Sequence, residues 1–265
     1  MGISHDGKTL YTFAGYGAGG LWMSIDGGAT WTQRWTDPTG GSVGNDLYMI
    51  DVDPADDQHL LLTLHGNAPD ASYNNHVFVS GNGGTSWKDA GEPGITNSAY
   101  AFFITSTTWI AISQWTSNVN GTWRTTDAGA HWSQILDVEH GHGNDQIAVL
   151  PNGTVYLPGI GKSGGGVWRS NDYGATWTHV LSTNAEAAVV TTADNLYVSY
   201  GWATSDPNAP SLFHAARDDD QEWTRDAAPA AMTNGAKRAA VMFDGTHYVI
   251  VMGCFDAGIW RYVEP

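Results

Sequence analysis

The sequence predicts an all-β fold of the β-propeller type, and two repeated features carry that prediction. An eight-residue phrase that ends in tryptophan occurs four times, at 24–31, 80–87, 125–132 and 170–177. The aromatic residue that precedes each phrase recurs along the chain together with Phe213 and Trp260, at spacings of 56, 45, 45, 45 and 47 residues. A fixed period of this size indicates one supersecondary unit per repeat. Each unit can be read as four short strands, which is the blade of a propeller.

The phrase has the pattern Ser/Thr-x-Asp-x-Gly-x-Thr-Trp, and its residues suit a tight turn. The acid side chain can accept hydrogen bonds from nearby backbone N–H groups, and Gly tolerates positive φ. The Trp is expected to bury its ring between neighbouring sheets. A fifth copy at 216–223 keeps the acid and the Trp but lacks the Gly. The acids or amides of the phrase are therefore expected to serve folding: Asp26, Asn82, Asp127 and Asp172.

This phrase resembles the Asp-box of sialidase-like (BNR-repeat) β-propellers, and the resemblance implies a propeller for the whole chain. Six units of about 45 residues fill the 265 residues as one domain, so six blades are favoured and seven stay possible. The last blade lacks its outer strand. The predicted strands are 9–13, 21–24 and 30–34; 47–52, 59–64, 76–79 and 86–89; 99–104, 109–113, 122–125 and 131–136; 146–150, 154–157, 167–170 and 176–181; 187–191, 196–199, 212–214 and 222–225; and 239–243, 247–252 and 258–263.

Composition excludes several classes of partner. The net charge is −16 with 27 acidic and 11 basic residues, so nucleic acid and anionic membranes would be repelled. No stretch approaches the roughly 20 apolar residues of a membrane span. The single Cys254 excludes an intrachain disulfide framework. Few lysines and many Gly, Asn, Thr and Trp suit an extracellular protein, and because residues 1–6 are no secretion signal, a leader would have been removed.

The resemblance to these propellers implies that the functional face is built from the loops that lead into the innermost strands and those that join the second and third strands. An Asn recurs in the first class of loop, at positions 45, 97, 144, 184 and 234, where it suits a turn or a ring of amides. The acids Asp46, Asp145 and Glu186 stand beside these Asn residues without being required by the repeat. Carboxylates there could serve as acid and base.

Histidines add to this candidate site. His142 lies in the loop before the fourth blade, close to His140, and His65 opens the long loop of the second blade. With nearby acids they could form a general-base site or bind a divalent metal, although no cofactor is otherwise indicated. The alternative is that these are loop histidines hydrogen-bonded to backbone.

Aromatic and basic residues in the same loops point to sugars. Tyr16, Trp115 and Trp202 begin or occupy loops between second and third strands, and Trp115 and Trp202 have Asn or Asp neighbours. A sugar ring stacks its C–H face on such aromatics while its hydroxyls take directed hydrogen bonds, but ordinary loop packing is an equal alternative. The available cations to neutralise a uronate carboxylate are Lys162, Lys237 and Arg238.

These features predict an extracellular carbohydrate-active enzyme, either a glycoside hydrolase using Asp46 and Asp145 or a polysaccharide lyase using His142 or His65. The alternative is a propeller lectin that binds glycans without turnover, and a third option is a protein-interaction propeller. A sialidase is disfavoured, because the seven Arg residues supply no triad for a sialate carboxylate. The xyloglucanase-type relatives use two facing propellers, and a single propeller lacks that cleft.

Overall fold

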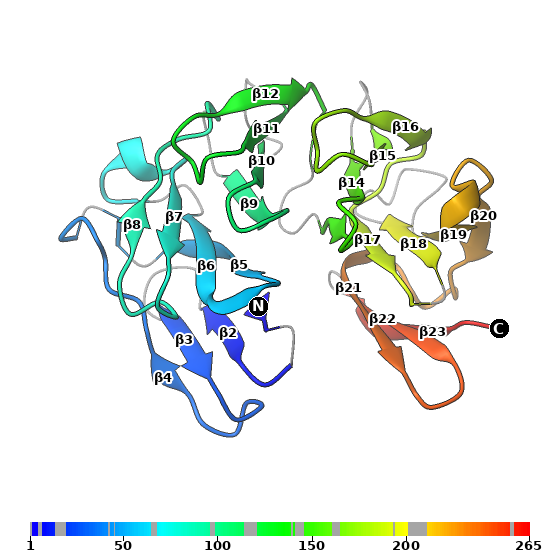
Figure 1. Cartoon of the computed structure of the whole chain (residues 1–265). Coiled ribbons are helices and arrows are strands. Elements are labelled where there is room, and N and C mark those ends of the chain that lie inside the picture. The colour runs from blue at the N-terminus through cyan, green and yellow to red at the C-terminus, as the bar shows by residue number, and fades with distance from the viewer. Residues whose placement is uncertain are drawn as a thin grey trace. The chain divides into compact units, whose positions relative to one another are not determined.

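The structure is a computed structural model of the chain. It describes every residue except 1, 5–6, 14–19, 42, 45, 65–67, 96–98, 114–120, 139, 141–145, 161–164, 193, 201–210 and 255–256. The chain divides into two compact units, Met1–Asp137 and Val138–Pro265. The described residues of each unit form three antiparallel sheets, and every sheet is made of strands that follow one another in the chain (Figure 1).

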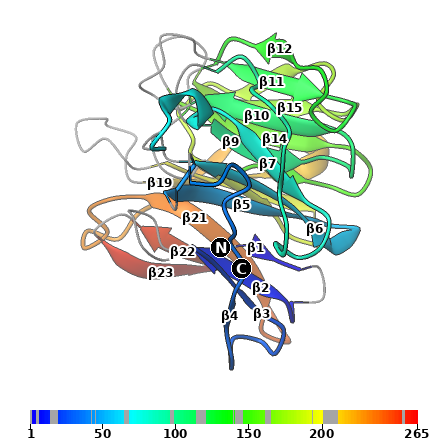
Figure 2. The same ribbon diagram turned by 90° about the vertical axis from the view of Figure 1, so that its left-hand side faces the viewer.

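The first unit contains the sheets β1-β2-β3-β4, β5-β6-β7-β8 and β9-β10-β11-β12, and Figure 2 shows the first of them in blue. The strand bounds are β1 Gly2–Ile3, β2 Leu10–Phe13, β3 Leu21–Ser24, β4 Thr32–Gln33, β5 Leu47–Asp53, β6 Asp56–Leu64, β7 Val77–Ser80, β8 Lys88–Asp89, β9 Ala99–Phe103, β10 Trp109–Ser113, β11 Thr122–Thr125 and β12 Ser133–Leu136. A short 3₁₀ helix, η1 (Ala71–Tyr73), lies between β6 and β7.

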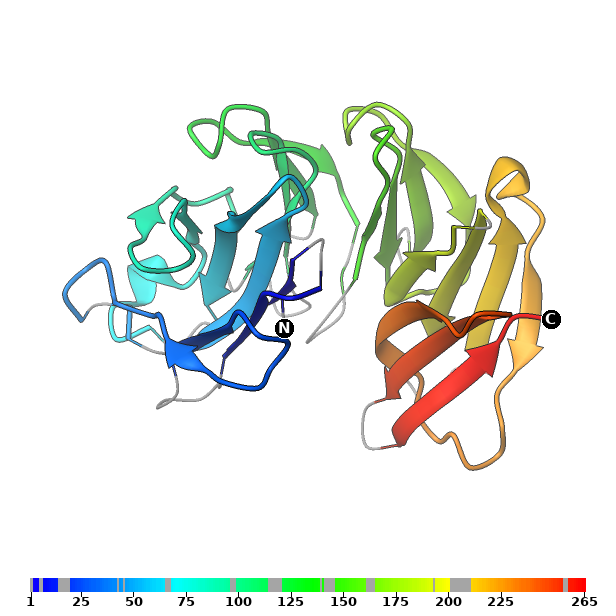
Figure 3. The same cartoon turned by 60° about the horizontal axis from the view of Figure 1, so that its bottom comes forward.

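The second unit contains two four-stranded sheets, β13-β14-β15-β16 and β17-β18-β19-β20, and a three-stranded sheet, β21-β22-β23, drawn in orange to red in Figure 3. The strand bounds are β13 Ala148–Val149, β14 Val155–Gly159, β15 Gly166–Ser170, β16 Thr178–Leu181, β17 Ala187–Val190, β18 Asn195–Tyr200, β19 Ser211–Ala216, β20 Thr224–Ala227, β21 Ala236–Phe243, β22 Tyr248–Cys254 and β23 Gly258–Val263. A 3₁₀ helix, η2 (Arg217–Asp219), separates β19 from β20.

The predicted fold is confirmed: the described chain is all-β, with six sheets that correspond to six propeller blades, and the sixth lacks an outer strand as expected. The prediction that residues 1–265 form one domain stays a prediction. The outer strands begin later than predicted. In the first five blades the outer strand starts one residue after the tryptophan of the phrase, as β4 does after Trp31, because the preceding residues are engaged in turn hydrogen bonds.

The middle strands of the blades carry the core. Every residue of β10 and of β14 is buried, in contrast to the in–out alternation of a sheet with one wet face. Sheets that are covered on both faces by neighbours have such continuous apolar strands. Trp109 is 0% exposed and packs edge-on against Phe103 with ring centroids 5.8 Å apart.

The repeated phrase, called the box below, forms one hydrogen-bonded turn. In the first box, Ser24 Oγ donates to Asp26 Oδ1 over 2.7 Å and accepts from Gly28 N at 2.8 Å. Asp26 also accepts from Thr30 N at 2.8 Å and from Thr30 Oγ1 at 2.6 Å, and Trp31 Nε1 donates to Gly28 O at 3.0 Å. The other three boxes make equivalent bonds from Ser80, Thr125 and Ser170. The predicted folding role of the box carboxylates agrees with this geometry.

The box tryptophans differ in burial. Trp87 is 9% exposed and packs on Trp35 of the preceding blade with ring centroids 5.6 Å apart. Trp132 packs against the core between the second and third blades. Trp31, however, is 38% exposed, so the expectation that each box Trp is buried between sheets is wrong for the first box. The described first unit offers no preceding blade for it to pack on.

The fifth copy of the box is remodelled because it lacks the glycine. In the intact boxes the glycine has positive φ, for example 94° at Gly28. Asp220 occupies this position with φ −76°, and the turn becomes the 3₁₀ helix η2. The Asp220 side chain is 2% exposed and accepts from Arg169 Nη1 at 2.6 and 2.7 Å and from the Tyr156 hydroxyl at 3.2 Å. An ion pair with the preceding blade thus replaces the box turn.

Box hydrogen bonds predict an acid-dependent loss of stability. Hydrogen bonds, of which that from the Thr176 hydroxyl is the strongest, lower the pKa of Asp172 to about 2. Equivalent hydrogen bonds lower the pKa values of Asp26 and Asp127 to about 2 as well. Because these values lie below the roughly 3.9 of an unfolded Asp, the stabilisation is complete above about pH 4 and is lost as the pH falls to about 2. Asp172→Asn is therefore expected to reduce the drop in melting temperature between pH 4 and pH 2, measured by circular dichroism.

The second box provides the matched control, because it already holds an amide. Asn82 Oδ1 accepts from Ser86 N at 2.9 Å and its Nδ2 donates to Ser86 Oγ at 2.8 Å, so an amide fits the turn. The reverse change, Asn82→Asp, is expected to steepen the acid dependence. An unchanged pH profile in both variants would show that the box carboxylates do not control acid stability.

Candidate functional site

A buried ion pair lies where the innermost strands of the fifth and sixth blades begin. Glu186 immediately precedes β17 and its side chain is 0% exposed, and Lys237, the second residue of β21, has a side chain that is 8% exposed. Lys237 Nζ pairs with Glu186 Oε1. The strands β17 and β21 are neighbours (Figure 1), which joins two residues 51 positions apart. We call these two residues and Gln146 the Glu186–Lys237 cluster.

Gln146 connects this pair to the fourth blade. Its backbone N–H donates to Glu186 O at 2.9 Å, and the residue forms a parallel bridge with Ala187. Its side chain accepts from Ala239 N at 2.9 Å and donates to Ala239 O at 3.0 Å. One glutamine therefore ties the innermost strands of three blades together through their backbones beside the ion pair.

Further polar groups surround the cluster. Glu186 N donates to Ser199 O at 2.8 Å, and the Ser199 hydroxyl donates to Ala236 O at 2.9 Å. Asn184 Nδ2 lies 3.5 Å from the hydroxyl of Tyr200. Amide, hydroxyl, carboxylate and ammonium groups thus gather at one end of the innermost strands, although Asn184 was expected only as a turn former or a member of an amide ring.

The burial of the pair does not by itself mark it as a stabilising contact. Removing two charges from water costs about as much as their attraction returns, so a buried ion pair is weak support for stability. The pairing also changes the expectation for Lys237, because a uronate carboxylate would have to compete with Glu186 for its ammonium. Arg238, the next residue of β21, is partly exposed.

In the first unit, Asp46 lies directly before β5 and is 7% exposed. The turn before it is organised by Asp37, whose Oδ2 accepts from Val43 N at 3.0 Å and Gly44 N at 2.6 Å. Burial opposes ionisation of Asp37, yet hydrogen bonds led by the Thr39 hydroxyl hold its pKa below the ordinary value. Asp46 is thus placed at the start of an innermost strand, as predicted.

Three of the predicted site residues, and Glu186, lie in the part of the chain that the structure describes: Asp46, Lys237 and Arg238. The structure brings Lys237 and Glu186 together and does not test the roles predicted for any of them. The remaining predicted residues lie outside the described part of the chain: Tyr16, His65, Trp115, His142, Asp145, Lys162 and Trp202. Their roles stay predictions.

A His–Asp pair in the second blade was missed from the sequence. His76 Nδ1 lies 2.8 Å from Asp89 Oδ2, and the two side chains are 19% and 33% exposed. The hydrogen bond to Asp89 raises the pKa of His76; burial raises the pKa of Asp89, but the hydrogen bond from His76 and that from Gly91 outweigh it, so the Asp89 pKa is lowered. Both residues lie at strand ends, and His76 directly follows the long 66–75 loop. This position of a histidine was the feature of the sequence that could have indicated the pair.

No group of three or more His, Cys, Asp or Glu side chains in the described part of the chain is arranged to hold a metal ion. Within the same residues, no helix has the length and apolar character needed to cross a membrane.

The sequence matches no known protein family and no curated protein. Solved structures do match. A YCF48 protein bound to D1 peptide shares 13% identity at a TM-score of 0.58, covering 95% of this chain and 74% of that one. The GH74 xyloglucanase from Xanthomonas campestris shares 19% identity at a TM-score of 0.66, and the alignment covers 99% of this chain and 43% of the xyloglucanase.

An ancestral GH74 enzyme shares 16% identity at a TM-score of 0.63. The alignment covers 98% of this chain and 35% of the enzyme, so the chain spans less than half of each GH74 protein. At these identities the comparisons show the propeller fold alone.

Proposed function

We propose that the chain is a carbohydrate-active propeller, a glycoside hydrolase or polysaccharide lyase, whose glycan binds over the start of the innermost strands of the second unit. The Glu186–Lys237 cluster carries this proposal. A hydroxyl-rich ligand needs donors and acceptors held in fixed directions, and in this cluster a buried carboxylate that no blade repeat requires fixes the Lys237 ammonium at the start of β21. The GH74 neighbours add support from fold likeness.

In this proposal the described residues hold other groups in place and do not take part in the reaction. Glu186 is 0% exposed, so its part is to hold the Lys237 ammonium in place rather than to touch a glycan. The reacting groups would come from the segment directly before Gln146. Asp145 is the proposed acid or base of a hydrolase, and His142 the proposed base of a lyase, with Arg238 facing the uronate carboxylate. The predicted roles of Asp46 and His65 in the other unit stay predictions.

Three broader assignments accompany the proposal. We assign the chain to the Asp-box sialidase-like propellers, supported by the shared hydrogen bonding of the four intact boxes. We place it outside the cell, supported by its low lysine content and abundant Trp, Gly and Thr. A carbohydrate is the proposed partner, and the charge of −16 argues against nucleic acid.

One observation favours a lectin as the second candidate. Glu186 and Lys237 neutralise each other, so neither is an acid or a base poised to transfer a proton, and what Lys237 can offer a ligand is a hydrogen bond. A site of this kind can bind a glycan without turnover.

Incubation with plant, bacterial and animal polysaccharides separates these functions. New reducing ends without absorbance near 235 nm are expected from a hydrolase, and both signals together from a lyase. Replacing Asp145 by Asn should then abolish hydrolase activity, and His142→Ala should abolish lyase activity, while far-UV circular dichroism stays unchanged. Retention on a glycan array without either signal would move the protein to the lectin class. If the protein neither degrades any of the polysaccharides nor is retained on the array, the proposal is wrong.

A further inference from the structure

The second blade has the longest connection between second and third strands of any of the six sheets, at 65–76. Consecutive strands of this blade run in opposite directions, so the starts of β5 and β7 and the ends of β6 and β8 share one edge of the sheet. The connection therefore lies at the edge where Asp46 precedes β5. A long loop carried at one edge of a rigid sheet is a common place for ligand-binding residues.

The described part of this connection, 68–76, is held by its own hydrogen bonds. Asn74 Oδ1 accepts from Ala68 N at 2.8 Å, and His76 N donates to Tyr73 O at 3.1 Å. The Tyr73 ring is partly buried and packs against the core of the first two blades. The loop thus presents Tyr73 and His76 in fixed positions.

Asp89, at the end of β8, holds the His76 ring. His76 Nδ1 lies 2.9 and 2.8 Å from Asp89 Oδ1 and Oδ2, and Gly91 N donates to Asp89 Oδ1 at 2.7 Å. The ring also meets that of Tyr73 edge-on, with centroids 5.1 Å apart. Because the carboxylate binds Nδ1, Nε2 is the ring nitrogen left for a ligand.

Glu92 brings a second carboxylate close to His76. Asn75 Nδ2 donates to Glu92 Oε2 and to Ile95 O, each at 2.6 Å, and the Glu92 residue is exposed. The hydrogen bond to Asp89 is the main cause of the raised pKa of His76; burial opposes it, and the charges of Asp89 and Glu92 raise it further. A histidine and a carboxylate therefore lie close together on the surface of the first unit.

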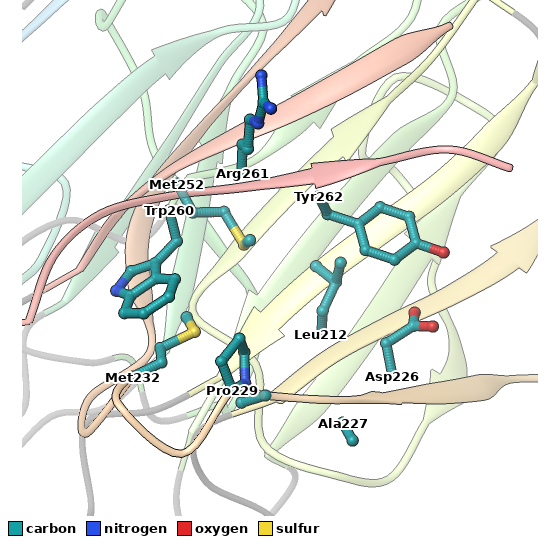
Figure 4. Close-up of a pocket in the computed structure, with 10 residues that line it drawn as sticks. Leu212, Asp226, Ala227, Pro229, Met232, Met252, Trp260, Arg261 and Tyr262 are labelled. Atoms are coloured by element: carbon teal, nitrogen blue, oxygen red, sulfur yellow. The ribbon is translucent and has the colours of Figure 1, made fainter.

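A pocket of about 140 Å³ in the second unit is a poorer fit for a sugar than these loop residues. Apolar side chains such as Leu212 and Met232 line it, and Figure 4 shows Arg261 directed away from them. Asp226 also lines the pocket, but its Oδ2 lies 2.6 Å from His214 Nδ1. The pocket therefore offers a hydroxyl-rich ligand few directed hydrogen bonds.

We propose that Tyr73, His76 and Glu92 form a second carbohydrate-binding site, on the first unit. A sugar ring packs its C–H face against the exposed part of the Tyr73 ring, and its hydroxyls bond with His76 Nε2 and with the Glu92 carboxylate. The inference rests on the proposed function, because it takes the ligand to be a glycan. It adds a binding site that is distinct from the Glu186–Lys237 cluster.

Isothermal titration with the plant, bacterial and animal polysaccharides tests this site. Tyr73→Ala and His76→Ala should each weaken binding of the polysaccharide that the wild type binds by at least about fivefold, with an unchanged far-UV circular dichroism spectrum. His131→Thr is the matched control. His131 Nδ1 likewise lies 2.7 Å from Asp127 Oδ2, but it belongs to a box in which Thr is the usual residue, so this variant should keep the wild-type affinity.

An NMR titration of the unchanged protein applies even if a variant does not fold. Oligosaccharides cut from the bound polysaccharide should shift the Cε1–H signal of His76 and leave that of His131 in place. If the wild type binds no polysaccharide, the proposed function and this inference are both wrong. If it binds one while the His76 signal stays in place, or while both variants keep the wild-type affinity, only the second site is wrong.

Discussion

Replacement of Lys237 by methionine is expected to lower the free energy of unfolding by about 3–5 kcal/mol. The change leaves the carboxylate of Glu186 buried without its ammonium partner, and Glu186 is 0% exposed. An uncompensated buried charge is costly because water cannot reach it. Urea unfolding followed by tryptophan fluorescence measures the loss.

The double variant Glu186→Leu/Lys237→Met is the control for this prediction. Removing both charges removes the desolvation cost together with the attraction, so its stability should lie within about 1 kcal/mol of the wild type or above it. A double variant as unstable as Lys237→Met alone would show that the loss comes from packing and not from the unpaired carboxylate.

Trp109→Ala is expected to destabilise the first unit by about 3–5 kcal/mol. The Trp109 side chain is 0% exposed, packs against Phe103 and Trp132, and donates from Nε1 to Ser106 O at 3.2 Å. Truncation leaves a cavity between the second and third blades that the surrounding sheets cannot fill. Thermal unfolding of the purified variant measures the effect.

Trp31→Ala is the matched control, because Trp31 is also a strand-flanking tryptophan with a backbone hydrogen bond but is 38% exposed. Its replacement should cost much less than that of Trp109. If the two variants lose equal stability, burial in the inter-blade core is not what makes Trp109 important.

The repeats made the fold predictable, but the ends of its strands were less so. The box and its period predicted six blades and the missing outer strand of the last one. They did not predict that outer strands start only after the box tryptophan, because the expected turn hydrogen bonds reach as far as Thr30, whose backbone N–H bonds to Asp26 Oδ1 and is not available to a strand ladder. The exposure of Trp31 also depends on which blade precedes it, and no local pattern contains that information.

The candidate site was predictable in location but not in pairing. Glu186 and Lys237 were both expected near the start of innermost strands, yet as an acid and a uronate-binding cation with separate roles. Their contact depends on the adjacency of β17 and β21, which lie 51 residues apart at this pair. Opposite charges near the starts of the innermost strands of consecutive blades were the signal that could have predicted it. His76 and Asp89 likewise meet only because β7 and β8 pair.

The most direct test of the central claim is the affinity of the Glu186→Leu/Lys237→Met variant for a polysaccharide that the wild type binds or degrades. Isothermal titration compares the two proteins under identical conditions, and the unfolding measurements above establish whether the variant is folded. If the Glu186–Lys237 cluster positions the glycan, the variant should bind at least about tenfold more weakly. An unchanged affinity in a fully folded variant would contradict the placement of the glycan site at this cluster.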